Sequence, residues 1–342
     1  MPVLNVPKKV VIVFLFLICS SMLFYYGCIL LEPASELLDI KVEKIIFIKP
    51  GSTVDKVAQQ LSQENIIVDP LVFKLYLRFK GVAEKVQAGH YRLSSKMTLN
   101  QIINKLITGD MANYQLTVPE GATIENIAHR LTKRGIKKEE FLKLAHSTRL
   151  NFVNLKPQAR EKIIYTLEGF LFPDTYRIPY GSSAQKIISI MVDGFRGRID
   201  DLDYQIVNSK YDLQEIITIA SLIQSEGQLE HEFPVISSVI YNRLERGMKL
   251  QIDATIQYIL PQRKARLLYS DLKVDSPYNT YLNYGLPPGP ISNPGLTAIK
   301  AALQPAETDY LYYVAVGDGE HKFSETYREH LKAQNKLEDR SK

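Results

Sequence analysis

Tryptophan is absent from the 342-residue sequence, and cysteine occurs only at Cys19 and Cys28. Both cysteines lie inside one N-terminal apolar run, so the rest of the chain can form no disulfide. If this protein binds sugars, tyrosine and phenylalanine must supply the stacking surfaces. The chain contains 20 tyrosines, which is enough for that purpose.

Several sequence motifs are missing as well. There is no Walker phosphate loop, no G-x-G-x-x-G and no serine-centred elbow, and the six histidines are scattered without a pair at metal-ligand spacing. We therefore expect neither a cofactor nor a metal. The net charge of +5 includes Lys8 and Lys9, and without them 40 basic residues face 37 acidic ones. Such a balanced surface does not favour nucleic acid as a partner.

The N-terminal apolar run covers residues 10–31 and carries no charge. As a helix, its 22 residues would extend about 33 Å, which matches the hydrocarbon core of a bilayer. Lys8 and Lys9 precede the run and acidic residues follow it, which predicts a cytoplasmic tail at 1–9. We expect a single-pass protein of the cell inner (plasma) membrane whose C-terminal domain is periplasmic or extracytoplasmic.

An internal repeat follows this run. Residues 46–61 (IFIKPGSTVDKVAQQL) resemble residues 115–131 (QLTVPEGATIENIAHRL), and a fainter copy covers 97–106. Each copy has a β-prone stretch, a turn, a threonine in the N-cap position and an amphipathic helix. We interpret residues 40–150 as small LysM-like β–α units. Such units either bind wall polysaccharide or serve only as stable packing units, and the sequence leaves both open.

Glu226 ends an otherwise apolar helix predicted over Leu213–Glu226. At 100° per residue its side chain falls between Ile219 and Leu222, along the apolar stripe, and Gly227 can end the helix. Burial and the negative end of the helix dipole both raise the pKa of such a carboxyl. It could then donate a proton to a glycosidic oxygen, or it could pair with a buried arginine.

Polar residues after Glu226 offer further candidates for a site. A helix predicted over 235–246 places Arg243 in the middle of its apolar face and Asn242 at the margin, so Arg243 must meet a buried carboxylate or loop carbonyls. Residues 250–255 alternate, which predicts a strand with Gln251 and Asp253 on one face, suited to a sugar cleft or to half-exposure. Residues 285–295 hold four prolines and three glycines, which predicts a rigid loop before a helix at 296–303 and a strand at 310–316.

These stretches together resemble the endolytic murein transglycosylases, the MltG or YceG-like family. The similarity rests on EGFLFPDTY (168–176), ASLIQSEG (220–227), YNRLERGMKLQIDATIQY (241–258), SPYNTY (276–281) and GLPPGPISNPG (285–295). It implies an inner-membrane enzyme that cuts nascent peptidoglycan strands internally, with peptidoglycan synthases as partners. It places the catalytic acid at Glu226. The family usually has Glu-x-Glu here, whereas this chain has Gln224, which puts any helper role of the first acid in doubt.

The implied reaction needs one carboxylate, which protonates the bridge between MurNAc and GlcNAc and then accepts the proton of the C6 hydroxyl, leaving a 1,6-anhydro end. Two alternatives are a muramidase that uses Glu226 with Asp253, and an inactive membrane-anchored scaffold that binds the wall. We expect an α+β fold, with a mixed catalytic domain over 151–337. The residues assigned to substrate binding are Gln251, Asp253, Tyr278, Asn279, Tyr281 and Asn242.

Overall fold

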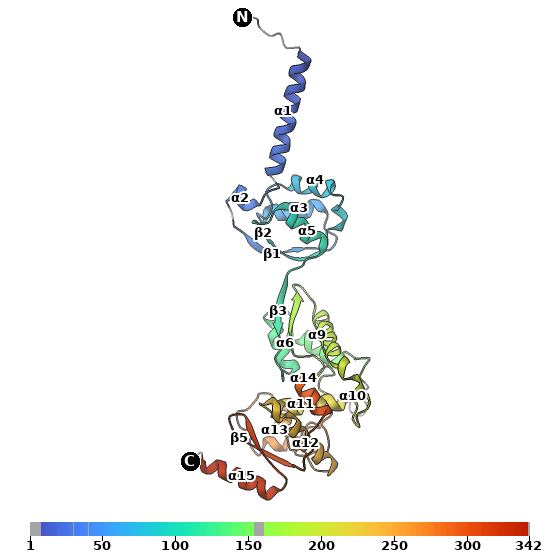
Figure 1. The fold of residues 1–342 in the computed structure, drawn as a ribbon, viewed down its shortest axis with the longest axis vertical. Coiled ribbons are helices and arrows are strands. Elements are labelled where there is room, and N and C mark those ends of the chain that lie inside the picture. Colours follow the sequence, from blue (N-terminus) through green and yellow to red (C-terminus); the bar gives the residue numbers. More distant parts are fainter. Residues whose placement is uncertain (1–7, 30, 40, 154–160, 341–342) are drawn as a thin grey trace. The chain divides into compact units, whose positions relative to one another are not determined.

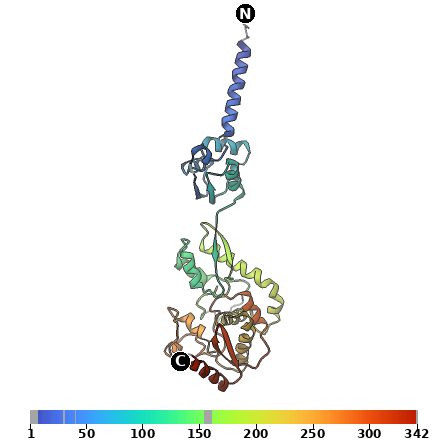
Figure 2. The same ribbon diagram turned by 60° about the vertical axis from the view of Figure 1, so that its left-hand side comes forward.

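The computed structural model describes residues 8–29, 31–39, 41–153 and 161–340. Contacts divide the chain into two compact units (Figures 1 and 2). Unit 1 comprises residues 1–114 and 177–182, and unit 2 comprises residues 115–176 and 183–342. The division at residue 114 differs from the expected one at 150, because the second repeat belongs to unit 2.

The first element of unit 1 is helix α1, Lys8–Ile29. Its described apolar side chains are exposed, among them Phe14, Phe16 and Phe24. Among the residues that the structure describes, no helix combines the length and apolar character that a membrane crossing requires. The transmembrane helix predicted over 10–31 is therefore not supported.

The remainder of unit 1 packs helices against a two-stranded sheet. Strand β1 pairs with β2 in antiparallel register, with Ile46 opposite Tyr91. Both of these residues are buried, and Leu61 and Phe73 join the same core. The elements are α2 (Ala34–Leu38), β1 (Glu43–Ile48), α3 (Val54–Gln63), α4 (Pro70–Phe79), the 3-10 turn η1 (Ala83–Lys85), β2 (Gly89–Ser94) and α5 (Leu99–Thr108).

The structure confirms the β–turn–α pattern of the internal repeat. Thr53, Thr98 and Thr123 are the N-caps of α3, α5 and α6 (Ile124–Thr132), and each side chain accepts a backbone N–H bond. Gly51 and Gly121 both have φ of +73°, a left-handed conformation that suits glycine. A second helix, α7 (Lys138–Ser147), follows α6, and β3 (Asn113–Thr117) pairs with β4 (Thr175–Pro179). Among the described residues, a strand followed by two helices occurs in both copies, and each copy pairs its strand with a later one.

Unit 2 is built around helix α11, Leu213–Glu226, as the sequence predicted. Asp212 and Glu215 form a capping box at its start, and residues 216–223 are all buried. α11 packs against α12 and α14. The other elements are α9 (Ala184–Ile199), η2 (Asp200–Leu202), α10 (Asp203–Val207), η3 (Glu230–Glu232), α12 (Phe233–Glu245), α13 (Asp253–Ile259), η4 (Asp271–Lys273), α14 (Leu296–Leu303), β5 (Tyr312–Gly317), β6 (Glu320–Ser324) and α15 (Tyr327–Arg340).

The end of α11 depends on the small size of Gly227. This glycine has an ordinary extended conformation, with φ of −82°, so backbone freedom does not explain its presence. A Cβ atom at this position would lie 2.6 Å from the ring of Phe233 and 3.0 Å from Ile236. The glycine therefore allows α12 to approach the end of α11 closely, beside Glu226.

The strand predicted over 250–255 is wrong. Residues from Asp253 onward form helix α13 instead. The backbone N–H of Ile252 donates to Oγ1 of Thr280, and the Thr255 hydroxyl donates back to the Ile252 carbonyl, so the segment turns directly into a helix. Six alternating residues are too few to distinguish a strand from such a turn. The α+β class is correct, because helices surround small two-stranded sheets.

Candidate active site

Glu226 is the last residue of α11 and is half-buried. Its Oε2 accepts a hydrogen bond from the hydroxyl of Tyr313 on β5 at 2.9 Å. Its Oε1 lies 3.4 Å from the backbone nitrogen of Ala254, near the start of α13. Three elements that are distant in sequence therefore meet at this carboxyl.

The surroundings of Glu226 favour its protonated form. Burial raises the pKa of the carboxyl above its usual value, and the nearby Asp253 raises it further. Hydrogen bonds from Tyr313 and Ala254 oppose this effect without reversing it. The neutral carboxyl that these effects favour is the form that can donate a proton to a bound oxygen.

Asp253 and Tyr281 are the predicted site residues that the structure brings to Glu226. The Tyr281 hydroxyl donates to Oδ1 of Asp253 at 2.5 Å, and the Asp253 side chain is exposed. Burial, and then the bond to Asp253, raise the pKa of Tyr281, so it stays a donor. This pair places an exposed carboxyl group beside the half-buried Glu226.

Arg243 supports the site from α12. Its Nε donates to the carbonyl of Leu311 and its Nη1 to the carbonyl of Leu250, each at 2.6 Å. The guanidinium also lies over the ring of Tyr312, 5.2 Å from the centroid. Of the two partners expected for Arg243, a buried carboxylate or loop carbonyls, the structure shows the carbonyls. The side chain joins the start of the hairpin that carries Tyr313 to the segment before Asp253.

Three other residues assigned to substrate binding are engaged by the protein itself. Asn279 is fully buried, and its Nδ2 donates to the carbonyls of Leu272 and Val274. Tyr278 is 1% exposed and packs against Tyr258. The amide of Asn242 donates to two carbonyls in the segment before β5, those of Thr308 and Tyr310. In these positions the three side chains hold the walls of the site rather than face a ligand.

Gln251 has an exposed side chain and a left-handed backbone, with φ of +48°. Its backbone nitrogen donates to the carbonyl of Thr280 at 3.1 Å. A non-glycine residue is strained in this conformation, and such strain is concentrated at functional sites. Of the six residues assigned to substrate binding, Gln251 joins Asp253 and Tyr281 in presenting polar atoms at the surface near α13.

The proline-rich segment 285–295 is a fixed loop, as predicted. Asn293 is fully buried and its amide donates to the carbonyl of Ala122 at 2.8 Å and to Oε1 of Glu168 at 3.2 Å. The N–H of Gly295 donates to Oε1 of Gln224 at 2.8 Å. Gln224 therefore binds this loop to α11, and the amide oxygen suffices for that contact.

Glu168 is a buried acid that the sequence did not single out for a role. It is 1% exposed and accepts hydrogen bonds from the Ile124 backbone, at the start of α6, and from the Tyr258 hydroxyl at 3.0 Å. Burial raises its pKa to about 8. Its position between α6, α13 and the loop at Asn293 gives it a role in assembling the site. The run of apolar residues around it in 165–176 was the only sequence signal of its burial.

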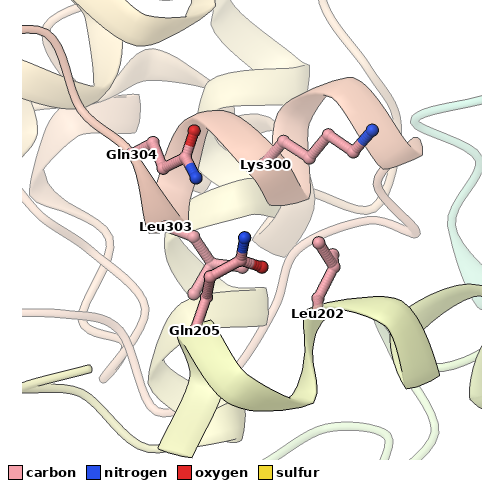
Figure 3. A pocket seen from close by; sticks show the side chains of 5 residues that line it. All are labelled: Leu202, Gln205, Lys300, Leu303 and Gln304. Carbon is pink, nitrogen blue, oxygen red and sulfur yellow. The ribbon is translucent and has the colours of Figure 1, made fainter. Parts of the chain in front are cut away.

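A separate cavity of about 250 Å³ lies between α14 and the segment of η2 and α10 (Figure 3). Its lining includes Leu202, Gln205, Lys300, Leu303 and Gln304, and Glu226 is not among them. In Figure 3 the amides of Gln205 and Gln304 point toward one another. Within the described ranges, no group of three or more histidine, cysteine, aspartate or glutamate residues could hold a metal ion.

Comparison with known proteins places this arrangement in a family. A sequence model described as the YceG-like family matches residues 46–336. The chain belongs to the YceG-like family. A crystal structure of a YceG-like protein from Listeria monocytogenes is 34% identical, covers 86% of this chain and 99% of its own, and superposes with a TM-score of 0.59.

Two YceG-like relatives are named endolytic murein transglycosylase. The relative from Bacillus subtilis (strain 168) is 38% identical over 326 residues, which cover 92% of this chain and 89% of that protein. The relative from Streptococcus pneumoniae serotype 2 (strain D39) is 30% identical over 310 residues, which cover 83% of this chain but only 56% of that protein. The family predicted from the sequence motifs is confirmed.

Proposed function

We propose that this chain is an endolytic peptidoglycan lytic transglycosylase. It cleaves the β-1,4 bond between MurNAc and GlcNAc inside glycan strands and leaves 1,6-anhydro-MurNAc ends. The names of the relatives support the class of reaction. The observation that carries the residue assignment is the half-buried Glu226, whose pKa is raised by burial at the end of α11.

Glu226 acts twice in the proposed reaction. As the neutral acid it gives its proton to the bridging oxygen, and the bond from the MurNAc anomeric carbon to that oxygen breaks. As the resulting carboxylate it takes the proton of the MurNAc C6 hydroxyl, whose oxygen bonds to the same anomeric carbon. The acid is thereby regenerated and no water is consumed. The raised pKa of Glu226 favours the neutral form that begins the reaction and makes the resulting carboxylate a stronger base for the second step.

The exposed carboxylate of Asp253 stabilises positive charge on the sugar ring in this scheme. The Tyr281 hydroxyl holds it in place with the bond at 2.5 Å. Gln251 supplies a further polar contact to the strand. Water is not the nucleophile, so Asp253 needs only to be negative and near the ring.

The same pair of carboxyl groups keeps a hydrolase as the second candidate. A muramidase would use Glu226 as acid and Asp253 as nucleophile or base. Asp253 lies near Glu226, because the backbone of the next residue, Ala254, contacts the Glu226 carboxyl. This proximity is the observation that supports a muramidase. Mass spectrometry of glycan digested by the purified chain separates the two functions, because a lytic transglycosylase leaves anhydro ends and a hydrolase leaves reducing ends.

We also propose that the chain acts on the extracytoplasmic side of the plasma membrane, where its substrate lies, near the synthases that extend the strands. The test is to fractionate cells that carry the tagged full-length protein and, separately, cells that carry a tagged variant starting at residue 32. The fraction in which each protein is recovered is then compared. Recovery of the full-length protein in the cytosolic fraction would contradict it.

We also propose that the LysM-like units bind glycan. The basis is the order of elements in unit 1, in which a strand is followed by two helices and a second strand. The test is retention of the full chain on insoluble peptidoglycan after Glu226→Gln has removed cleavage. A substitution that exposes no core, such as Lys56→Ala on α3, tests the helix surface. Equal retention of all surface variants of unit 1 would leave the units as packing elements.

A further inference from the structure

Tyr313 contacts the proposed acid directly. Its hydroxyl donates to Oε2 of Glu226 at 2.9 Å across 87 positions of sequence. The side chain is half-buried on β5, and its pKa is raised by burial and then by the charge of Glu226, so it remains a donor. The hydroxyl therefore meets the carboxyl as a fixed hydrogen-bond donor.

The pair of Glu232 and His321 contacts the ring of Tyr313. The ring of His321 on β6 lies edge-on to it, with centroids 5.4 Å apart and an interplanar angle of 86°. Both carboxylate oxygens of Glu232 bind His321, one through its backbone nitrogen at 2.9 Å and one through Nδ1 at 2.7 Å. Glu232 is 7% exposed and belongs to η3, between α11 and α12. The hairpin that carries Tyr313 is thus attached to the two helices beside Glu226.

The direction of the Tyr313 bond restricts where Glu226 can hold a proton. Because the hydroxyl donates to Oε2, that oxygen acts as an acceptor. Oε1 accepts the longer and weaker bond, from the Ala254 N–H at 3.4 Å, so the proton of the neutral acid is better placed on Oε1, on the side of Asp253. We propose that Tyr313 is a positioning residue that directs the transferable proton of Glu226 to Oε1, and that the Glu232–His321 pair holds Tyr313 in place. This inference rests on the proposed role of Glu226 as the acid.

The test is a Tyr313→Phe variant of the full-length chain, which removes the hydroxyl and keeps the ring against His321. A donor to the ionised carboxyl is lost, so the pKa of Glu226 should rise. The alkaline limb of the pH–rate profile should move to higher pH. We expect kcat at neutral pH to fall about 10- to 100-fold with little change in KM, as for loss of one hydrogen bond to a charged group.

The pKa of Glu226 can be measured without catalysis by carbon-13 NMR of labelled glutamate carboxyl groups, assigned with Glu226→Gln. The other titratable and charged groups near it are Asp253 of α13, Tyr281, Arg243 of α12 and His321 of β6, all unchanged in the variant. The control is Tyr312→Phe on the same strand, whose ring would stay over Arg243. It should leave the pKa of Glu226 unchanged.

His321→Asn gives a second test that does not alter Tyr313. The asparagine amide can still bond Glu232 but leaves the ring of Tyr313 without its neighbour. We expect a shift of the Glu226 pKa in the same direction and a smaller loss of kcat. A folded Tyr313→Phe variant with the wild-type Glu226 pKa would overturn the proposal, and so would a His321→Asn variant with wild-type pKa and kcat. Reducing ends from wild-type enzyme would refute the transglycosylase reaction alone, because the NMR titration does not depend on the product.

Discussion

Replacing Arg243 with methionine removes a guanidinium from the middle of an apolar helix face. The carbonyls of Leu311 and Leu250, both in buried residues, each lose a hydrogen bond of 2.6 Å. A hydrogen bond to a charged group contributes about 1.5–3 kcal/mol, and methionine keeps part of the packing. We therefore expect the free energy of unfolding to fall by about 3–5 kcal/mol, and Tm to fall by roughly 6–20 °C in a unit of this size.

The assay is thermal and urea unfolding followed by circular dichroism. Arg246→Met is the matched control. Arg246 lies three residues further along the chain, where its side chain is 52% exposed and pairs with Asp309 at 3.9 Å. A surface pair of this kind contributes at most about 1 kcal/mol. Arg243→Lys should fall between the two, because one ammonium cannot reproduce the two directed bonds. Melting curves of Arg243→Met and Arg246→Met that coincide would refute the role assigned to Arg243.

Three further changes test the supports of the site and of unit 1. The stability of the wild type should fall as pH rises from the usual glutamate pKa of 4.5 toward about 8, because folded Glu168 keeps a proton that the unfolded chain releases. Urea unfolding across this range should show a much flatter dependence of stability on pH for Glu168→Gln. Equal pH dependence in the two proteins would contradict the effect of burial on Glu168. Asn293→Ala removes the side-chain oxygen that accepts from the buried Leu171 N–H and the amide that donates to Ala122 and Glu168, and should cost about 2–4 kcal/mol in denaturant unfolding. Asn283→Ala, at an exposed position, should cost less than about 1 kcal/mol. Thr98→Ala removes a capping box from α5 and should destabilise unit 1 by about 1 kcal/mol, so an unchanged urea midpoint would count against the cap.

Local sequence signals predicted the helices around the site well. The apolar stripe and its flanking residues gave the limits of α11 and α14, and the repeated threonines gave the N-caps at Thr53 and Thr123. These features depend on neighbours within a few residues, which a pattern can show. The mid-stripe position of Arg243 also predicted that polar partners hold it, without deciding between a carboxylate and the carbonyls that the structure shows.

The sequence pattern could not predict contacts between segments that are distant along the chain. Tyr313 was placed on a predicted strand, but its bond to Glu226 depends on how β5 packs against the end of α11. Likewise, the sequence assigned Asn279 to substrate binding, whereas in the structure its amide donates hydrogen bonds to the backbone carbonyls of Leu272 and Val274. A polar side chain in a proline-rich loop has the same sequence signal whether it faces a ligand or the protein's own backbone.

The most direct test of the central claim is the mass of the glycan ends released by the purified full-length chain from intact peptidoglycan strands. If Glu226, whose pKa is raised by burial, acts first as acid and then accepts the C6 proton, wild-type protein should yield internal fragments with 1,6-anhydro-MurNAc ends. Folded Glu226→Gln should yield none. Reducing ends from wild type, or anhydro ends persisting in Glu226→Gln, would contradict the single-acid mechanism.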